Sequence, residues 1–212
     1  MSKNEEILEA ALKLFNKHGI DPVKTRDIAK AVGISLGNMT YYFPSKNDII
    51  YSLCLQCIGE VDKAFERVSE KKVKNVMEMY YNQVESIYLT QLRFSFLFDK
   101  RYGEIIASLP DIQKHYQDVL KMRFDSFKYI NTQLVNENMA NQSLVKDSFA
   151  HGYIINMLAL FWHQELTIYF PQFTDRQKVD HALAVYFQSY KPYLTKKGVA
   201  VLSPFLKKLE HY

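Results

Sequence analysis

Glycine and proline are scarce in this sequence, which has 7 Gly and 6 Pro among its 212 residues. β-Sandwiches and barrels need many tight turns, and these two residues mark most of them. The sequence also lacks any sustained alternation of apolar and polar residues, which is the pattern of a half-buried strand. These absences argue against strand-rich folds and favour long helices.

Signals for a membrane or a secretory route are missing as well. No apolar run approaches the roughly 18 residues of a transmembrane helix. The first ten residues, MSKNEEILEA, lack the apolar segment of a signal peptide. Two cysteines cannot by themselves form a disulfide framework or a four-cysteine zinc site. We therefore expect a cytoplasmic protein that has no membrane contact, resident metal or cofactor.

The residue patterns of common enzyme classes are absent too. The sequence contains no G-x-S-x-G, no glycine-rich phosphate loop, no H-E-x-x-H and no EF-hand loop. We expect that the protein is not an enzyme.

Charge does not single out a nucleic-acid-binding segment. The formal net charge is +4, and residues 1–50 contain seven Lys or Arg and six Asp or Glu. A weakly basic balance permits contact with nucleic acid but does not demonstrate it. The arrangement of residues has to identify any such segment.

Apolar residues at helical spacing are the main pattern that is present. Ile7, Ala11, Leu14 and Phe15 form the stripe of a first helix, and Gly19 is suited to ending it. Two short helical patterns follow. Thr25 can cap the first of them, and Gly33 ends it. Ser35 can cap the second, which covers residues 36–42. Two short helices joined by a three-residue turn are the sequence form of a helix-turn-helix.

Helical periodicity then continues towards the C-terminus, so the predicted fold class is all-α. Three caps are indicated by Ser45 with Asp48, Thr174 with Gln177, and Ser203 before Pro204. The expected helices cover residues 46–70, 73–92, 94–108, 111–138, 144–169, 175–191 and 204–211.

The short helix over 36–42 carries small and polar residues that suit a DNA surface. Gly37 lets the backbone approach a duplex closely, and the N–H groups of a helix N-terminus suit phosphate. Asn38 and Thr40 are placed to reach base edges, and Arg26 can read guanine bidentately. Tyr42 fits either DNA contact or packing. Side chains that can add donors around the phosphates are Thr25, Ser35, Tyr41 and Lys46.

Residues 1–50 resemble the DNA-binding domain of the tetracycline-repressor (TetR) family. The positions that carry the resemblance are His18-Gly19, Thr25, Asp27-Ile28-Ala29, Gly33-Ile34-Ser35, Gly37, Tyr42-Phe43, Ser45-Lys46 and Ile49-Ile50. Thr40 departs from the pattern, because the family usually has Tyr there, so backbone contacts are expected to fall to Tyr41. Lys24-Thr25 also departs at a place where two hydroxyl residues are common.

The resemblance implies a homodimeric transcriptional regulator, usually a repressor, that binds a palindromic operator in double-stranded DNA and is released by a small-molecule effector. It assigns residues 1–46 to a helix-turn-helix domain and residues 47–212 to a helical domain for effector binding and dimerisation. We expect helices within 144–169 and 175–191 to pair with their copies. The small residues that allow a close approach are Ala150, Gly152, Ala159, Ala182 and Ala184. The alternative is a helical carrier or interaction protein that retains a helix-turn-helix without binding an operator.

Aromatic residues are concentrated outside the first domain, where 26 of the 30 lie after residue 46. Together with a few polar groups, they have the usual composition of a ligand site. Packing of the core is the alternative role for each of them. The candidate residues for an apolar or aromatic effector are Tyr88, Phe94, Phe98, Tyr102, Phe124, Phe127, Trp162 and His163.

Three other groups of residues leave alternatives open. Cys54 and Cys57 share a helix face and fit helix packing, thiol sensing or metal binding. His151, like His163, fits a buried polar group with local partners or an effector contact. Arg93 and Arg101 fit surface ion pairs or anchors for an anionic ligand.

Overall fold

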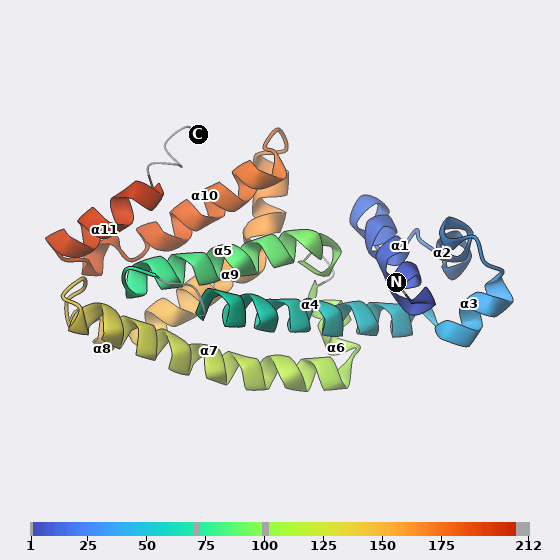
Figure 1. Cartoon of the computed structure of the whole chain (residues 1–212), viewed down its shortest axis with the longest axis horizontal. Coiled ribbons are helices and arrows are strands. Elements are labelled where there is room, and N and C mark those ends of the chain that lie inside the picture. The colour runs from blue at the N-terminus through green and yellow to red at the C-terminus, as the bar shows by residue number, and fades with distance from the viewer. Residues whose placement is uncertain (1, 70–72, 99–101, 207–212) are drawn as a thin grey trace.

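The computed structural model describes residues 2–69, 73–98 and 102–206, and within these ranges its regular secondary structure is helical, apart from a single bridge between Ala140 and Leu194. The all-α prediction is confirmed. A small group of helices forms one end of the molecule, and a long helix leads from it into a larger helical body (Figure 1). We call the small group the head; it consists of α1 (Lys3–His18), α2 (Thr25–Val32) and α3 (Leu36–Tyr42).

Local capping explains the short helices of the head. Gly33 ends α2 with φ 74°, a left-handed conformation that favours glycine. The Ser35 hydroxyl accepts from the Asn38 N–H at 3.1 Å, so Ser35 caps α3 as predicted. The predicted cap at Thr25 is wrong, because α2 already begins there. The Lys24 N–H instead donates to the Asp27 carboxylate at 2.8 Å.

The helix α4 (Lys46–Ser69) connects the head to the body. The Ser45 N–H donates to the Asp48 carboxylate at 2.8 Å, and the Asp48 N–H donates back to the Ser45 hydroxyl at 3.3 Å. This reciprocal pair is the predicted capping box.

In the body, α5 (Val76–Arg93) lies centrally and contacts α4, α7 (Pro110–Asn136) and α10 (Asp175–Gln188). The fifth long helix, α9 (Ser148–Tyr169), packs against both α7 and α10. The shorter elements are η1 (Ser95–Phe98), α6 (Tyr102–Ala107), α8 (Ser143–Lys146), η2 (Lys191–Tyr193) and α11 (Lys196–Leu206).

The single helix predicted over 94–108 is replaced by η1 and α6. Phe94, Phe96 and Phe98 are all buried. The Phe96 N–H donates to the Asn16 side chain of α1 at 3.1 Å, so it does not make the helical bond that would continue α5. All three rings enter the head core described below. The helix predicted over 144–169 is likewise divided, into α8 and α9.

The C-terminal helix also differs from its prediction. It begins at Lys196 and not at Pro204, which lies near its end. The Thr195 hydroxyl accepts from the Gly198 N–H at 3.2 Å and so starts the helix earlier. Residues 207–211 of the predicted helix lie outside the described residues.

Two clusters of buried apolar side chains fill the molecule. The first, which we call the head core, joins residues of α1–α4 to Phe94, Phe96 and Ile112. The rings of Phe15 and Phe96 lie 5.3 Å apart. The second, the body core, is formed chiefly by α5, α7, α9 and α10. The head is therefore continuous with a segment that follows it by about 50 residues in the chain.

A polar contact reinforces this junction. The Asn16 amide donates to the Arg93 carbonyl at 2.8 Å and accepts from the Phe96 N–H at 3.1 Å. The Arg93 guanidinium forms ion pairs with Glu9 of α1, at 3.4 Å, and with Glu60 of α4. The head is thus attached to the body both through α4 and through the end of α5. Among the described helices, none is both long and apolar enough to cross a membrane.

Candidate functional site

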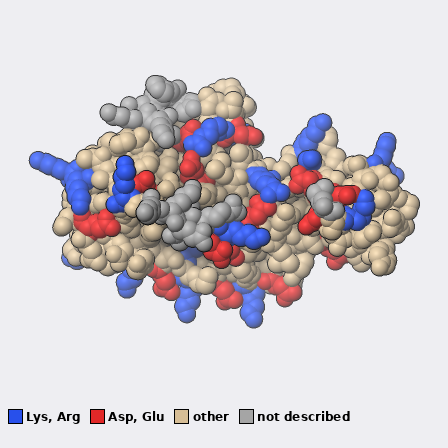
Figure 2. Space-filling view, viewed as in Figure 1, with Lys and Arg blue, Asp and Glu red and all other residues tan. Residues whose placement is uncertain are grey.

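The outer face of α3 is exposed, and α3 lies at the outer end of the head (Figure 1). Met39 is completely buried and fixes the inner face of the helix in the head core. Tyr41 is 83% exposed, the most of any large apolar or aromatic side chain among the described residues. The residues on the outer face are Ser35, Leu36, Gly37, Asn38, Thr40 and Tyr41. Their surface carries no charge, and in Figure 2 the end of the molecule that holds α3 is mostly uncharged.

Five of the nine predicted DNA-contact residues lie on this face, and the other four belong to α2, the end of α3 and the start of α4. Arg26 is exposed, with its Nε 4.0 Å from the Asp27 carboxylate. Thr25 is half-buried in the first turn of α2. The Thr40 hydroxyl donates to the Leu36 carbonyl at 2.7 Å, which leaves its oxygen to accept. Tyr42 is half-buried and meets Tyr41 edge to face, with ring centroids 5.3 Å apart.

Lys46 has a structural role that the sequence did not reveal. Its ammonium donates to the carbonyls of Ile20, at 2.9 Å, and Val23, at 3.1 Å. These contacts hold the connection between α1 and α2 against the start of α4. A lysine ammonium has three donors, so one remains for another acceptor.

The body contains a cavity of about 340 Å³ between α4, α5, α7, α9 and α10. Its volume falls in the range typical of small-molecule sites. Two of the predicted effector residues, Tyr88 and Phe127, line it. We call it the main cavity; its other lining residues are Val61, Asp62, Tyr80, Gln83, Val84, Ile87, Gln91, Val119, Met122, Arg123, Ser126, Ile130, Asn156, Ala159 and Tyr186.

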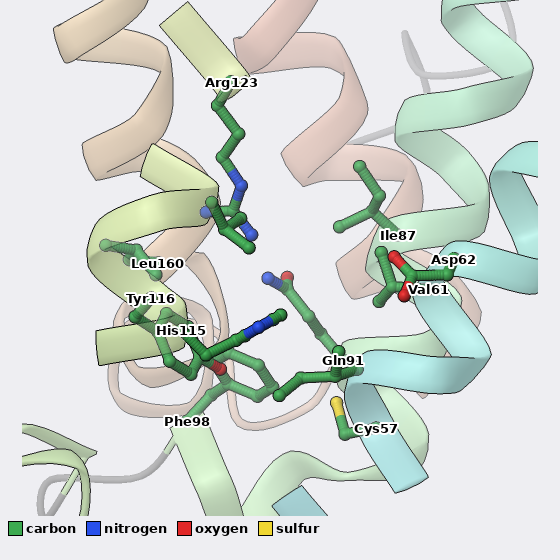
Figure 3. Close-up of a pocket in the computed structure, with 12 residues that line it drawn as sticks. Cys57, Val61, Asp62, Ile87, Gln91, Phe98, His115, Tyr116, Arg123 and Leu160 are labelled. Carbon is green, nitrogen blue, oxygen red and sulfur yellow. The ribbon is translucent and has the colours of Figure 1, made fainter. Parts of the chain in front are cut away.

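A second, smaller chamber of about 50 Å³ adjoins the main cavity, as the two share six lining residues. The predicted residue Phe98 lines this chamber, which we call the side chamber (Figure 3). The shared residues are Val61, Asp62, Ile87, Gln91, Val119 and Arg123, and those of the side chamber alone are Cys57, Ile58, Phe98, His115, Tyr116 and Leu160.

Trp162 contacts two residues that line the main cavity, Tyr88 and Gln91. Its ring stacks on Tyr88 at 5.0 Å, and its indole N–H donates to the Gln91 carbonyl oxygen at 2.6 Å. Trp162 and Tyr88 also line a third pocket of about 410 Å³, formed by α9 and α10.

Phe94, Phe124 and His163 do not line these cavities. Phe94 is completely buried in the head core. Phe124 stacks on Phe149 at 5.2 Å, and His163 is half-buried beside Trp162. The side chain of Tyr102 lies outside the described residues. Aromatic content alone does not distinguish a ring that packs a core from one that lines a cavity.

Sequence reasoning missed the polar residues of the cavities. Arg123 occupies the apolar stripe of α7, four residues after Val119 and four before Phe127. Gln91 similarly follows Val84 and Tyr88 in the stripe of α5. A polar residue within an apolar stripe is either buried or faces a cavity. The positions of Arg123 and Gln91 in these stripes could therefore have indicated a polar cavity from the sequence alone.

The two cysteines are buried in the head core, where desolvation raises the pKa of each thiol to about 12.

His151 is buried, and its Nε2 lies 3.0 Å from the Ser189 hydroxyl, while desolvation lowers the pKa of its imidazole. Arg93 is ion-paired, and Arg101 lies outside the described residues. Over the described ranges, no group of three or more His, Cys, Asp or Glu residues is arranged to hold a metal.

Large apolar side chains are exposed along one side of α9 and on α10. We call this surface the outer stripe; it consists of Ile154, Met157, Phe161 and Ile168 with Val185 of α10. The spacing of three, four and seven residues places the α9 members on one face. Some of the small residues expected to bring two copies together lie inside the body and not on this surface. Gly152 faces the Phe124 and Phe127 rings of α7, and Ala182 and Ala184 are buried.

The fold and the head together define a helix-turn-helix protein with a helical body. Two family models match the chain: bacterial regulatory proteins of the tetR family over residues 7–53, and a bacterial transcriptional repressor of the TetR type over residues 59–202. The second alone covers more than half of the sequence, and the chain belongs to the TetR family of transcriptional regulators. Like the family itself, the relatives below are regulators and not enzymes.

Individual relatives are distant. The uncharacterised HTH-type transcriptional regulator YuxN of Bacillus subtilis is 30% identical over 136 residues, which cover 63% of this chain but 45% of YuxN. The chain thus spans less than half the length of that relative. The HTH-type transcriptional regulator AcrR of Shigella flexneri is 23% identical over 82% of both chains. A TetR-family regulator from Marinobacter aquaeolei has the same fold, with a TM-score of 0.84, 21% identity and 98% coverage of both chains.

Proposed function

We propose that this regulator is a repressor that binds a palindromic operator as a homodimer and leaves it when a small molecule occupies the main cavity. In this proposal residues 1–46 bind DNA, and residues 47–212 bind the effector and dimerise. The observation that carries the proposal is the exposed, uncharged outer face of α3, held in place from behind by the buried Met39.

The geometry of the head supports the proposed DNA contacts. Asn38, Thr40 and Arg26 are exposed and can reach base edges in the major groove. Tyr41 and the third donor of Lys46 can bind phosphates on either side. Thr25, Ser35, Gly37 and Tyr42 complete the surface, the glycine by allowing close approach of the backbone.

The outer stripe supports dimerisation through α9 and α10. A contiguous row of large apolar side chains on a protein surface usually marks an interface. In a two-fold dimer the same stripe meets its own copy, and the two heads then match half-sites about 34 Å apart or a multiple of that distance.

The place of the main cavity supports release by an effector. It is lined partly by α4, whose other end begins at the head. A ligand that shifts α4 would change the spacing of the two α3 helices in the dimer. The operator accepts one spacing, so ligand and DNA oppose each other with a coupling of typically ~1–3 kcal/mol.

Fluorescence anisotropy with operator fragments selected from genomic DNA tests DNA binding. Asn38→Ala is expected to reduce the preference for operator over random DNA by ~1–3 kcal/mol without changing thermal stability. Lys46→Ala should weaken binding to both DNAs and also lower the free energy of unfolding by about 1–2 kcal/mol, because two carbonyl contacts are lost. Lys128→Ala, on the exposed side of α7, is the matched control.

The protein would instead be a carrier if it binds a ligand in the main cavity but binds no operator at any salt concentration. A true regulator dimer that neutralises about six to ten phosphates should lose ~10³–10⁵ in affinity between 50 and 200 mM salt.

A further inference from the structure

The side chamber gathers hydrogen-bond donors that have few partners within the protein. Arg123 of α7, Gln91 of α5 and His115 of α7 all line it. In Figure 3 these three side chains converge on one space, while Asp62 lies on its opposite side. Donors that converge in this way suit an acceptor group of a ligand.

Arg123 brings a cation to the side chamber. Its guanidinium is half-buried and donates to the Asn156 side-chain oxygen at 3.3 Å. Among the described residues it makes no ion pair within 4.0 Å, although Asp62 lines the same chamber. Desolvating a guanidinium is costly unless an anion and further hydrogen bonds compensate it. A carboxylate matches the planar fork of the guanidinium bidentately.

Gln91 is oriented by a residue outside the chamber. The Trp162 indole N–H can only donate, so the atom that it contacts in the Gln91 side chain, at 2.6 Å, is the carbonyl oxygen. The amide nitrogen is thereby left on the other side, where it points into the side chamber (Figure 3). Because Gln91 is only 5% exposed, this orientation is held by packing as well. The chamber thus presents an N–H₂ group and not a carbonyl.

The main cavity continues from this point as a mostly apolar space. Val84, Ile87, Val119 and Ile130 form its apolar wall. The Tyr88 hydroxyl is completely buried and has no hydrogen-bond partner among the described residues. An unpaired buried hydroxyl is unfavourable, so it is an additional place for a polar substituent of a ligand.

We propose that the effector is an organic monocarboxylate with an apolar or aromatic body, its carboxylate bound by Arg123, Gln91 and His115 in the side chamber and its body in the main cavity. This inference rests on the proposed function of the main cavity as the effector site. A permanent cation is the least favoured ligand, because the Arg123 guanidinium repels it and the Gln91 amide presents donors. Asp62 is exposed to solvent, which screens its repulsion of a carboxylate.

Calorimetric titration of the protein with three matched probes tests the proposal: 2-naphthoate, its neutral amide 2-naphthamide, and 2-naphthylmethylammonium. The same comparison with decanoate and decanamide covers a flexible body. For at least one body shape, the carboxylate should bind about tenfold or more tightly than its amide, as expected for hydrogen bonds to a charged group. The ammonium should bind most weakly.

Arg123→Gln should reduce carboxylate binding to the level of the amide and leave amide binding unchanged, which shows at the same time that the cavity still forms. Lys128→Gln, an exposed residue on the same helix, is the matched control and should change neither. Arg123→Lys should retain part of the preference, because it keeps the charge but loses the fork.

The proposal is overturned if neither carboxylate binds better than its amide, including the case in which nothing binds. It is also overturned if the ammonium binds best and loses its affinity in Asp62→Asn. Measuring operator release with the same probes shows whether the carboxylate proposal alone has failed or the proposed repressor function has failed as well. An amide or ammonium that binds the cavity and releases DNA would disprove the carboxylate class and leave the repressor intact.

Discussion

At the scale of single residues, the buried thiols of Cys54 and Cys57 have a measurable consequence. Burial raises the pKa of each to about 12, against an ordinary value of 9.0. Near pH 9 the unfolded chain therefore releases protons that the folded chain keeps. The thiols therefore leave the free energy of unfolding unchanged below pH 9. Between pH 9 and 12 they lower it, by up to about 1.4 kcal/mol per pH unit for each thiol.

Urea unfolding at pH 8, 9 and 10 checks this prediction. Stability should fall above pH 9, and a Cys54→Ala/Cys57→Ala variant should show a shallower fall. Its remaining slope would come from buried tyrosines such as Tyr80, whose pKa is also raised by desolvation. Both thiols should resist iodoacetamide at pH 8 in the folded protein. Rapid labelling of either one would contradict their burial and revive thiol sensing.

At the scale of elements, Gly198 fixes how α11 lies against the body. A Cβ at this position would stand 2.0 Å from the Met139 carbonyl oxygen, which is backbone and cannot move aside cheaply. The Thr195 N–H donates to the same carbonyl at 2.9 Å, so helix and loop are in direct contact. Only glycine permits this approach.

Gly198→Ala should accordingly lower the free energy of unfolding by about 1–3 kcal/mol, the usual cost of overpacking. Gly59 of α4 is the matched control, because nothing lies within 4 Å of its Cβ position. Gly59→Ala should be neutral or should stabilise α4 by about 0.5–1 kcal/mol through helix propensity. Denaturant titration of the two variants measures both effects, and equal stability of the two would show that α11 does not pack as described.

Which elements were predictable depends on how local their causes are. The turn at Gly33, the cap at Ser35 and the capping box of Ser45 with Asp48 follow from neighbouring residues, and the structure has all three. The close approach of α11 to the body depends on Met139, which is distant in the chain, and η1 depends on Asn16 in α1. No local pattern contains that information.

The two candidate sites also differ in how far the sequence predicts them. The exposed face of α3 follows from its spacing, since Met39 is the residue that turns inward. The cavities do not, because they require five helices to leave space between them. Phe94 and Phe98 are four residues apart and equally aromatic, yet one packs in the head core alone and the other also lines the side chamber. Only the tertiary arrangement decides between these roles.

At the scale of the whole molecule, the outer stripe gives a prediction about assembly. Phe161→Glu places a charge in the middle of the stripe, where it would have to be desolvated if two copies meet there. We expect this variant to sediment as a monomer at micromolar concentration and to bind operator much more weakly. Leu55→Glu, at a comparably exposed apolar site on α4, should remain a dimer. A wild-type protein that is itself monomeric at this concentration would refute the proposed interface.

The shared head core also determines where this chain can be divided and recombined. Phe94 and Phe96 contribute to the core that α1–α4 build, although they follow the head in sequence by about 50 residues. An excised fragment that stops at residue 46 would expose the apolar face that these rings cover, and so would a fragment that stops anywhere along α4. A chimaera that transplants this head onto the body of a relative must therefore carry residues 94–98 with it. In engineering terms, the exchangeable module is discontinuous, and a single crossover point will not give a stable hybrid.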